Sequence, residues 1–478
     1  ALTQQRRFAE ALAVADRLGK DPSKQADALV YRGSVLLAQH DNAGAEAAFN
    51  KAVSIESKNV KVLYARAIVL AALQRPGEAI RDFRAILSID SKNVAALLQL
   101  ARIAQQQGDD RSVVASLNQA IGAAPANMTP RIALMEYLIS RKKFPEAQAA
   151  ADGLFRVQPN NAEGLLLLGR IQLARGQNKE AIATYRRLVS LTPTAAGPQL
   201  LLGNALAISQ DRAGAARALE TAAKLSPASA EVKATQINFQ INQGNKDGAV
   251  ASARAFQAAN PGSPADLLLA ATLDRTNHRA DAIAVLNKSV SDRPNAEMLL
   301  QLANLTARTN DVARAGNLLS DWVAKNPNDL AVRLAYASHL MEHQANGQAI
   351  PQFEAVLKQD PNNVVAMNNL GWLLQTSDPK RAISLLMSAE KIAPNSPDIA
   401  DTLGWVKLQQ KDVAGGLALL NKAHGAKPQD GEITYHLAVA LDASGQRGPA
   451  RQMLKTLLAS GAKFQDLPAA NKLAADWH

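Results

Sequence analysis

The sequence of 478 residues predicts an all-α protein built from a repeated pair of helices. Three observations support this prediction. A proline or serine recurs every 33 or 34 residues, two amphipathic segments lie between successive copies, and small residues recur at fixed places in both segments. The recurring residues are Ser57, Ser91, Pro125, Pro159, Pro193, Pro227, Pro261, Pro294, Pro327, Pro361, Pro394 and Pro428.

Residues 162–193 show how one interval is built. The first segment is rich in leucine and is interrupted by the sequence RGQN at 175–178. The second segment ends at Pro193, because proline cannot continue the hydrogen bonding of a helix. Its apolar residues have the spacing of one buried helical stripe: Ala181, Ile182, Tyr185, Leu188 and Val189. After several closing prolines comes Asn, Asp or Ser, as in PNN at 159, and these side chains can cap the next helix.

The spacing of the closing residues divides the whole chain into predicted segments. We expect an array of about thirteen two-helix units over residues 23–462, with Gly or Ala in most first helices and Ala in most second helices. The leading stretch 1–22 has the pattern of a second helix whose first helix is missing, so we expect the chain to be the C-terminal part of a longer protein. Residues 463–478 have no closing proline and are predicted to form a helix that caps the array.

A 34-residue helix–turn–helix unit with this Gly/Ala, Ala and Pro pattern resembles the tetratricopeptide repeat (TPR), over nearly the whole chain. The resemblance implies an α-solenoid wound as a right-handed superhelix, in which the first helices line a concave groove for protein or peptide partners. The groove places of the family fall here on Tyr64, Arg102, Glu136, Arg170, Asn204, Asn238, Asn304, Asn368, Asn369, Trp372, Asp401, Trp405, Tyr435 and Asp442.

The chemistry of these groove residues suits an extended ligand. Amide and guanidinium groups can bond a peptide backbone or sugar hydroxyls. Trp372 and Trp405 lie one repeat apart and could stack on sugar rings or hold an aromatic side chain. The alternative is that both tryptophans simply pack between neighbouring helices.

The C-terminal repeats carry a second, narrower resemblance. The sequences NNLGWLLQ at 368–375 and DTLGW at 401–405, with the stretch up to 461, are similar to the TPR lipoproteins of exosortase and PEP-CTERM loci. That resemblance implies a non-catalytic scaffold in a bacterial exopolysaccharide pathway, periplasmic and lipid-anchored in the full-length protein. Two alternatives stay open: a general peptide-binding adaptor, and a scaffold of another polysaccharide secretion system.

The net charge of +11 is concentrated in the first half of the chain. Residues 51–200 hold 20 Lys and Arg against 11 Asp and Glu. Such a field could attract an anionic polysaccharide or another acidic partner, or it could belong to a solvated surface without a partner. The basic run RKK at 141–143 has only Phe144 beside it, so we expect no nucleic-acid partner.

Several chemistries are disfavoured by composition. The chain has no cysteine, which excludes thiol catalysis and Cys-type zinc sites. No apolar run approaches the roughly 18 residues of a membrane span, so we expect membrane association only through a lipid anchor absent from this chain. We expect no cofactor.

One short motif argues for an enzyme. The sequence HLMEH at 339–343 has the H-x-x-E-H order of a class of zinc peptidases. In the repeat register, however, it falls at the end of a first helix, where other repeats carry unrelated polar sequences. A peptidase would also need a third ligand. We therefore predict no catalytic residue, no metal site and no enzymatic activity.

Overall fold

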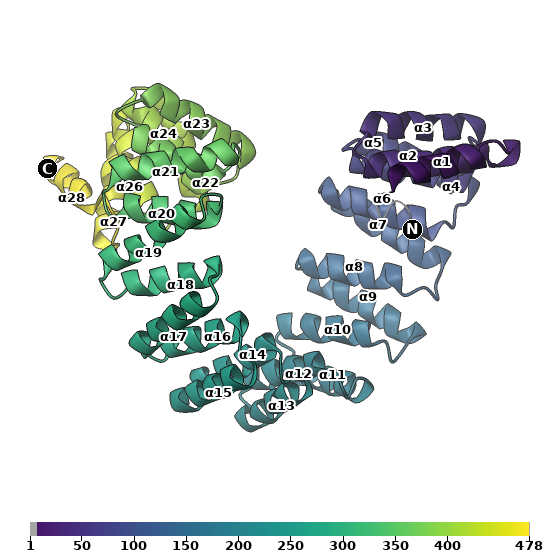
Figure 1. Cartoon of the computed structure of the whole chain (residues 1–478), viewed down its shortest axis with the longest axis horizontal. Helices are drawn as coiled ribbons and strands as arrows, with labels where there is room; N and C mark the ends of the chain where they lie inside the picture. The colour runs from purple at the N-terminus through teal and green to yellow at the C-terminus, as the bar shows by residue number, and fades with distance from the viewer. Residues whose placement is uncertain (1–6, 478) are drawn as a thin grey trace. The chain divides into compact units, whose positions relative to one another are not determined.

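The computed structural model describes residues 7–477, and Figure 1 shows that this part of the chain is helical throughout, without a β-strand. The predicted all-α fold is therefore confirmed. Two compact units divide the chain, one running up to Phe239 and the other starting at Gln240. None of the helices in the described range combines the length and apolarity that a membrane span requires.

Unit 1 begins with a single helix and continues as helix pairs. A short 3-10 turn at Pro22–Lys24 separates the single helix from the first pair. The helices are α1 (Phe8–Leu18), α2 (Gln25–Ala38), α3 (Asn42–Ile55), α4 (Val60–Ala72), α5 (Pro76–Ile89), α6 (Val94–Gln106), α7 (Asp110–Ala123), α8 (Thr129–Ser140), α9 (Phe144–Val157), α10 (Ala162–Ala174), α11 (Asn178–Leu191), α12 (Ala196–Ile208), α13 (Arg212–Leu225) and α14 (Ala230–Asn242), within which the unit boundary falls.

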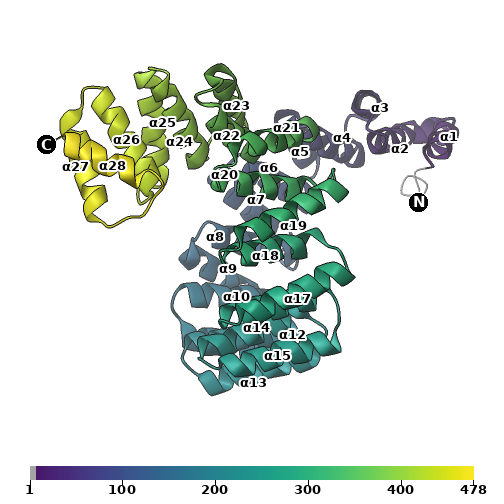
Figure 2. The ribbon, with the colours of Figure 1, turned by 60° about the vertical axis from the view of Figure 1, so that its left-hand side comes forward.

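Unit 2 continues the same pattern and ends with a single helix, and Figure 2 shows its last helices following one another toward the C-terminus. Its helices are α15 (Lys246–Ala259), α16 (Ser263–Arg275), α17 (Arg279–Asp292), α18 (Ala296–Ala307), α19 (Val312–Lys325), α20 (Leu330–Glu342), α21 (Asn346–Gln359), α22 (Val364–Leu374), α23 (Pro379–Ile392), α24 (Pro397–Gln409), α25 (Val413–Ala426), α26 (Gly431–Ala443), α27 (Arg447–Ala459) and α28 (Leu467–Asp476).

The helices can be placed on the predicted division of the chain, which itself stays a prediction. Helices α2 to α27 form thirteen pairs inside the expected array of 23–462, and α28 lies in the expected capping segment. Helix α1 lies in the segment 1–22, whose assignment to a truncated repeat stays a prediction. The start of that segment, residues 1–6, lies outside the described residues, as does residue 478.

The core is a series of small clusters that pass from one repeat to the next. Tyr185 and Leu188 of α11 pack between Leu165 of the preceding helix and Leu202 of the following one. Ala181 is also fully buried, as the predicted stripe requires. Each second helix therefore joins its own first helix to the first helix of the next repeat.

The small residues of the first helices make room for large side chains of the second helices. A Cβ atom added at Gly169 would overlap the ring of Tyr185, which is fully buried. One added at Gly371 would come within 2.6 Å of Leu386. The column of Gly and Ala residues thus reflects close contact between the two helices of a pair.

The turn within a pair uses a left-handed backbone. Twelve of the thirteen intra-pair turns contain one residue with positive φ, and the turn between α22 and α23 is the exception. In several of these turns the following N–H donates to the carbonyl five residues back, as from Arg75 to Leu70, which closes the first helix as a Schellman motif. Glycine occupies four of the twelve turns (Gly108, Gly176, Gly244, Gly445), and side chains occupy eight (His40, Gln74, Lys142, Gln210, Asn277, Asn310, Gln344, Lys411).

The polar residues after the closing prolines cap the next helices, as predicted. The Oδ1 atom of Asn161 accepts a hydrogen bond of 2.7 Å from the N–H of Gly164 at the start of α10. Asn363 makes the same contact with Ala366 at 3.0 Å, and Asp329 caps α20 at 3.2 Å. These bonds satisfy N–H groups that a helix start leaves free.

Asp266 is a buried carboxylate that ties three elements of unit 2 together. It lies on α16 and is 4% exposed. It accepts hydrogen bonds from Gln257 of α15 at 2.6 Å, from Ser289 of α17 and from Arg293. Burial opposes ionisation, but the bonds from Ser289, Gln257 and Arg293 outweigh it and hold the pKa of Asp266 below its usual value.

Candidate functional site

A polar groove runs along the first helices of unit 2. It consists of three adjoining clefts, between α16 and α18, between α18 and α20, and between α20 and α22. Gln301 and Asn304 line both of the first two clefts, and Ser338 and Glu342 line both of the last two, so the clefts are continuous. The last two have volumes of about 460 and 540 Å³. We call this surface the inner groove.

The clefts between α18 and α20 and between α20 and α22 expose more polar than apolar surface, whereas the cleft between α16 and α18 is mainly apolar. Asn304, Asn369 and Trp372 were predicted as groove residues, and all three line it. The amides of Asn304, Gln301 and Asn369 present both donors and acceptors. This chemistry suits an extended ligand with many hydroxyl or peptide groups.

Some lining residues were not among the predicted groove residues. Gln301, Ser338 and Glu342 occupy the sixth, ninth and thirteenth places of their first helices, so the repeat register itself marks them as groove positions. Gln465 lies outside the helix pairs, between α27 and α28, and no sequence signal points to it.

Aromatic rings gather at the C-terminal end of unit 2. Trp405 of α24 stacks on His436 of α26, with ring centroids 4.0 Å apart and planes inclined by 23°. Trp372 lies 6.2 Å from the same imidazole, and Tyr435 lies 6.1 Å from Trp405. Both tryptophans are half-buried. They therefore pack between repeats, as one alternative predicted. They also leave part of their surface exposed, as contact with a ligand would require.

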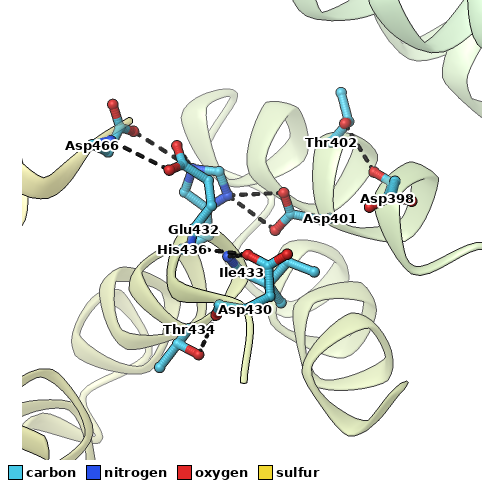
Figure 3. Close-up of polar contacts among 9 residues, drawn as sticks. All are labelled: Asp398, Asp401, Thr402, Asp430, Glu432, Ile433, Thr434, His436 and Asp466. Carbon is cyan, nitrogen blue, oxygen red and sulfur yellow. Dashed lines mark hydrogen bonds and ion pairs between the residues drawn. The ribbon is translucent and has the colours of Figure 1, made fainter. Parts of the chain in front are cut away.

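Two predicted groove residues serve the interior instead. Asp401 is 8% exposed and Tyr435 is 7% exposed. The carboxylate of Asp401 accepts from Nδ1 of His436 at 2.9 and 3.1 Å, as Figure 3 shows. The repeat register predicted that these two residues contact a ligand. Their side chains instead pack α24 against α26.

His436 is the buried centre of this cluster of aromatic and acidic side chains. Burial lowers the pKa of its imidazole, but the bond to Asp401 and the negative charges of Asp466 and Glu432 outweigh burial and raise the pKa to about 9. Sequence reasoning missed His436. The signal was present in Glu432 and His436, which stand four residues apart on one helix and therefore share a face.

The remaining predicted residues lie one per first helix. Five are exposed: Arg102, Glu136, Arg170, Asn204 and Asn238. Tyr64 is half-buried and its hydroxyl accepts from Gln99 at 3.3 Å. Asp442 is half-buried and lies 3.5 Å from Arg447. Asn368 is half-buried and its amide contacts Asn369 at 3.5 Å. That any of these residues binds a ligand stays a prediction.

The HLMEH motif does not gather a set of metal ligands. The rings of His339 and His343 lie 4.7 Å apart, and His339 and Glu342 line the inner groove. Within residues 7–477, however, these residues are not part of any group of three or more close metal-ligating side chains. The one such group in that range is Glu432, His436 and Asp466.

Comparison with known proteins gives a family and a set of distant relatives. A family model described as "Tetratricopeptide repeat" matches residues 1–59, 134–196, 200–264 and 334–397, more than half of the chain, and a second model of that description matches 407–476. The chain is 27% identical over 336 residues to "Cellulose synthase operon protein C" of Pseudomonas fluorescens (strain SBW25), which covers 63% of this chain and 25% of that protein.

A further relative and a solved structure were also found. "Cellulose synthase 2 operon protein C" of Komagataeibacter xylinus is 28% identical over 205 residues, which cover 42% of this chain and 16% of that protein. The chain thus spans a quarter or less of the length of these two relatives. Among solved structures, yeast Tom70 is 15% identical, with 89% of this chain and 97% of that chain covered and a TM-score of 0.42.

Proposed function

The chain is a member of the tetratricopeptide-repeat family, a family of protein-interaction scaffolds, and from that premise we propose that it is a non-catalytic scaffold in a bacterial envelope pathway for an exopolysaccharide. The observation that carries this proposal is the continuous inner groove of unit 2. Its amides and the half-buried Trp372 offer an extended partner many hydrogen bonds and an aromatic contact.

The pathway rests on two supports. Two relatives are named for cellulose synthase operons, which links this kind of repeat array to polysaccharide production. The C-terminal repeats resemble the TPR lipoproteins of exosortase and PEP-CTERM loci. We propose that the full-length protein works in that setting, in the periplasm and held by a lipid anchor. An anionic polymer along the basic residues of 51–200 would be a second partner.

Affinity capture from the native envelope tests the scaffold proposal. We expect the full-length protein to retain envelope proteins, and the double variant Asn304→Ala, Asn369→Ala to lose them. The matched control is Asn421→Ala, an exposed amide on the second helix α25. Equal retention by all three proteins would exclude the inner groove as the binding surface.

Gene deletion tests the pathway separately. We expect loss of exopolysaccharide or of surface-protein sorting in the deletion strain. Normal levels of both would refute the pathway while leaving the groove intact. Capture of cytoplasmic proteins alone would favour a general peptide-binding adaptor.

A further inference from the structure

A nitrogen atom of His436 faces two carboxylates across a gap. The imidazole is 1% exposed, and its Nδ1–H donates to Asp401, because an ionised carboxylate can only accept. This leaves Nε2, which is buried and has no hydrogen-bond partner. Nε2 lies 3.8 Å from Oε1 of Glu432 and 3.6 Å from Oδ2 of Asp466 (Figure 3).

A cation between these three atoms would be favourable. A neutral Nε2 would direct its lone pair at two negatively charged oxygens in a desolvated place, which is unfavourable. Either a proton on Nε2 or a metal ion between the three atoms relieves this. The two separations exceed the 2.7–3.2 Å of an N–H···O bond. They are close to the distance of about 3.4 Å between two ligands of a tetrahedral ion with bonds of about 2.1 Å.

The surrounding contacts hold the three atoms in place. Glu432 and His436 lie one turn apart on α26. The other oxygen of Glu432, Oε2, accepts from the backbone N–H of Asp466 at 3.3 Å, which directs Oε1 toward the imidazole. Asp401 on Nδ1 supplies the carboxylate–histidine pair that commonly orients a metal-binding imidazole.

We propose that Nε2 of His436, Oε1 of Glu432 and Oδ2 of Asp466 bind one divalent metal ion of the zinc class, with water as a fourth ligand. One imidazole and two carboxylates form a donor set that such ions accept. The side chains of Glu432 and Asp466 are 25% and 32% exposed, so the ion can enter from solvent. Because Asp466 immediately precedes α28, the ion would fasten the C-terminal helix to α26.

Zinc binding by the untagged full chain tests the proposal. The protein is stripped with a chelator, dialysed against zinc, and the bound metal is measured. We expect one zinc ion per chain, an affinity lowered at least about tenfold in Asp466→Asn, and a similar loss in Asp401→Asn, which removes only the orienting carboxylate. Far-UV circular dichroism reports whether each variant is folded. Asp466 is the more useful site because its side chain is partly exposed and outside the core.

The matched control is His343→Gln, an exposed histidine in the HLMEH motif of the same unit. It should bind zinc as the wild type does. A stoichiometry well below one, wild-type affinity in Asp466→Asn, or loss of binding in His343→Gln would each overturn the proposal. A nitrogen NMR signal showing Nε2 of His436 still protonated at saturating zinc would also overturn it and leave an imidazolium held by carboxylates.

Discussion

At the scale of single residues, glycine decides how closely the two helices of a pair approach. Gly169 of α10 lies against the ring of Tyr185. The ring is fully buried, so it has little room to move away from an added methyl group. A methyl group there must displace either the ring or a helix. Overpacking of this kind typically costs about 1–3 kcal/mol.

We therefore expect Gly169→Ala to lower the free energy of unfolding by about 1–3 kcal/mol. Urea unfolding followed by far-UV circular dichroism measures the change. Gly197→Ala is the control, since a Cβ atom at Gly197 meets no atom within 4 Å. It should change stability by no more than about 0.5 kcal/mol. Equal effects of the two substitutions would show that the Gly169–Tyr185 contact is not tight.

Asp266 allows a second test at a single residue. Asp266→Asn removes the charge that Ser289, Gln257 and Arg293 share, and hydrogen bonds to a charged group are worth about 1.5–3 kcal/mol. Arg293 is about half exposed, so we assign most of the lost stability to the bonds from Gln257 and Ser289. Tryptophan fluorescence during urea unfolding measures this change in the free energy of unfolding. Asp292→Asn, which breaks an exposed pair with Lys288, should cost about 0.5 kcal/mol or less.

The same carboxylate predicts a pH dependence. The folded-state pKa of Asp266 lies below its ordinary value of 3.8, so the folded state binds this proton less tightly than the unfolded state. The stabilisation is complete above pH 3.8 and is lost as the pH falls through the lower folded value. The stability difference between wild type and Asp266→Asn should therefore shrink in that acidic range. A difference that stays constant down to the lowest pH would contradict the assignment.

At the scale of helices, a capping side chain marks where many of the first helices begin. Asn161 accepts from Gly164 at 2.7 Å and starts α10 two residues after the closing proline of the previous repeat. The sequence predicted this role because an Asn, Asp or Ser follows several closing prolines, mostly two residues later. Helix starts could therefore be predicted closely, whereas the left-handed turns filled by His, Gln, Lys and Asn carry no such signal.

We expect Asn161→Ala to destabilise the protein by about 1 kcal/mol, because a first-turn N–H loses its acceptor. Asn161→Asp keeps an acceptor oxygen and should remain within a few tenths of a kcal/mol of the wild type. Thermal unfolding of the three proteins separates these outcomes. Equal destabilisation by Ala and Asp would mean that the amide acts through another contact.

At the scale of the whole molecule, the helices pack against near neighbours in sequence, so stability is a sum of local terms. All four tryptophans, Trp322, Trp372, Trp405 and Trp477, belong to unit 2. Fluorescence therefore reports on unit 2, whereas circular dichroism reports on the helices of both units. The two signals need not follow one transition.

We expect the fluorescence and circular dichroism curves of urea unfolding to have different midpoints. Gly169→Ala should move the dichroism curve and leave the fluorescence curve in place, because Gly169 belongs to unit 1. Superimposable curves that shift together would show that the chain unfolds as one cooperative body.

The fold could be predicted because its signals add over thirteen copies, so that an exception such as Met135 in the small-residue column does no harm. The site could be predicted only where it follows the register, as at Asn304 and Trp372. Asp401 follows the register as well, yet it turns to His436, a partner found in one repeat alone. Asp466 lies outside the helix pairs. Contacts that occur once depend on local packing, which periodicity does not describe.

Eight of the left-handed turns carry a residue other than glycine at the position with positive φ. Glycine at these positions would make the folded protein more stable. An L-residue with positive φ is strained by about 1–2 kcal/mol relative to glycine, and four turns of this chain already use glycine. Replacing Gln74, Lys142 or Gln210 with glycine would relieve that strain without touching the inner groove. Because distant repeats contribute independently, such gains should accumulate. The array thus offers an engineer a way to strengthen the scaffold one repeat at a time while its binding surface stays the same.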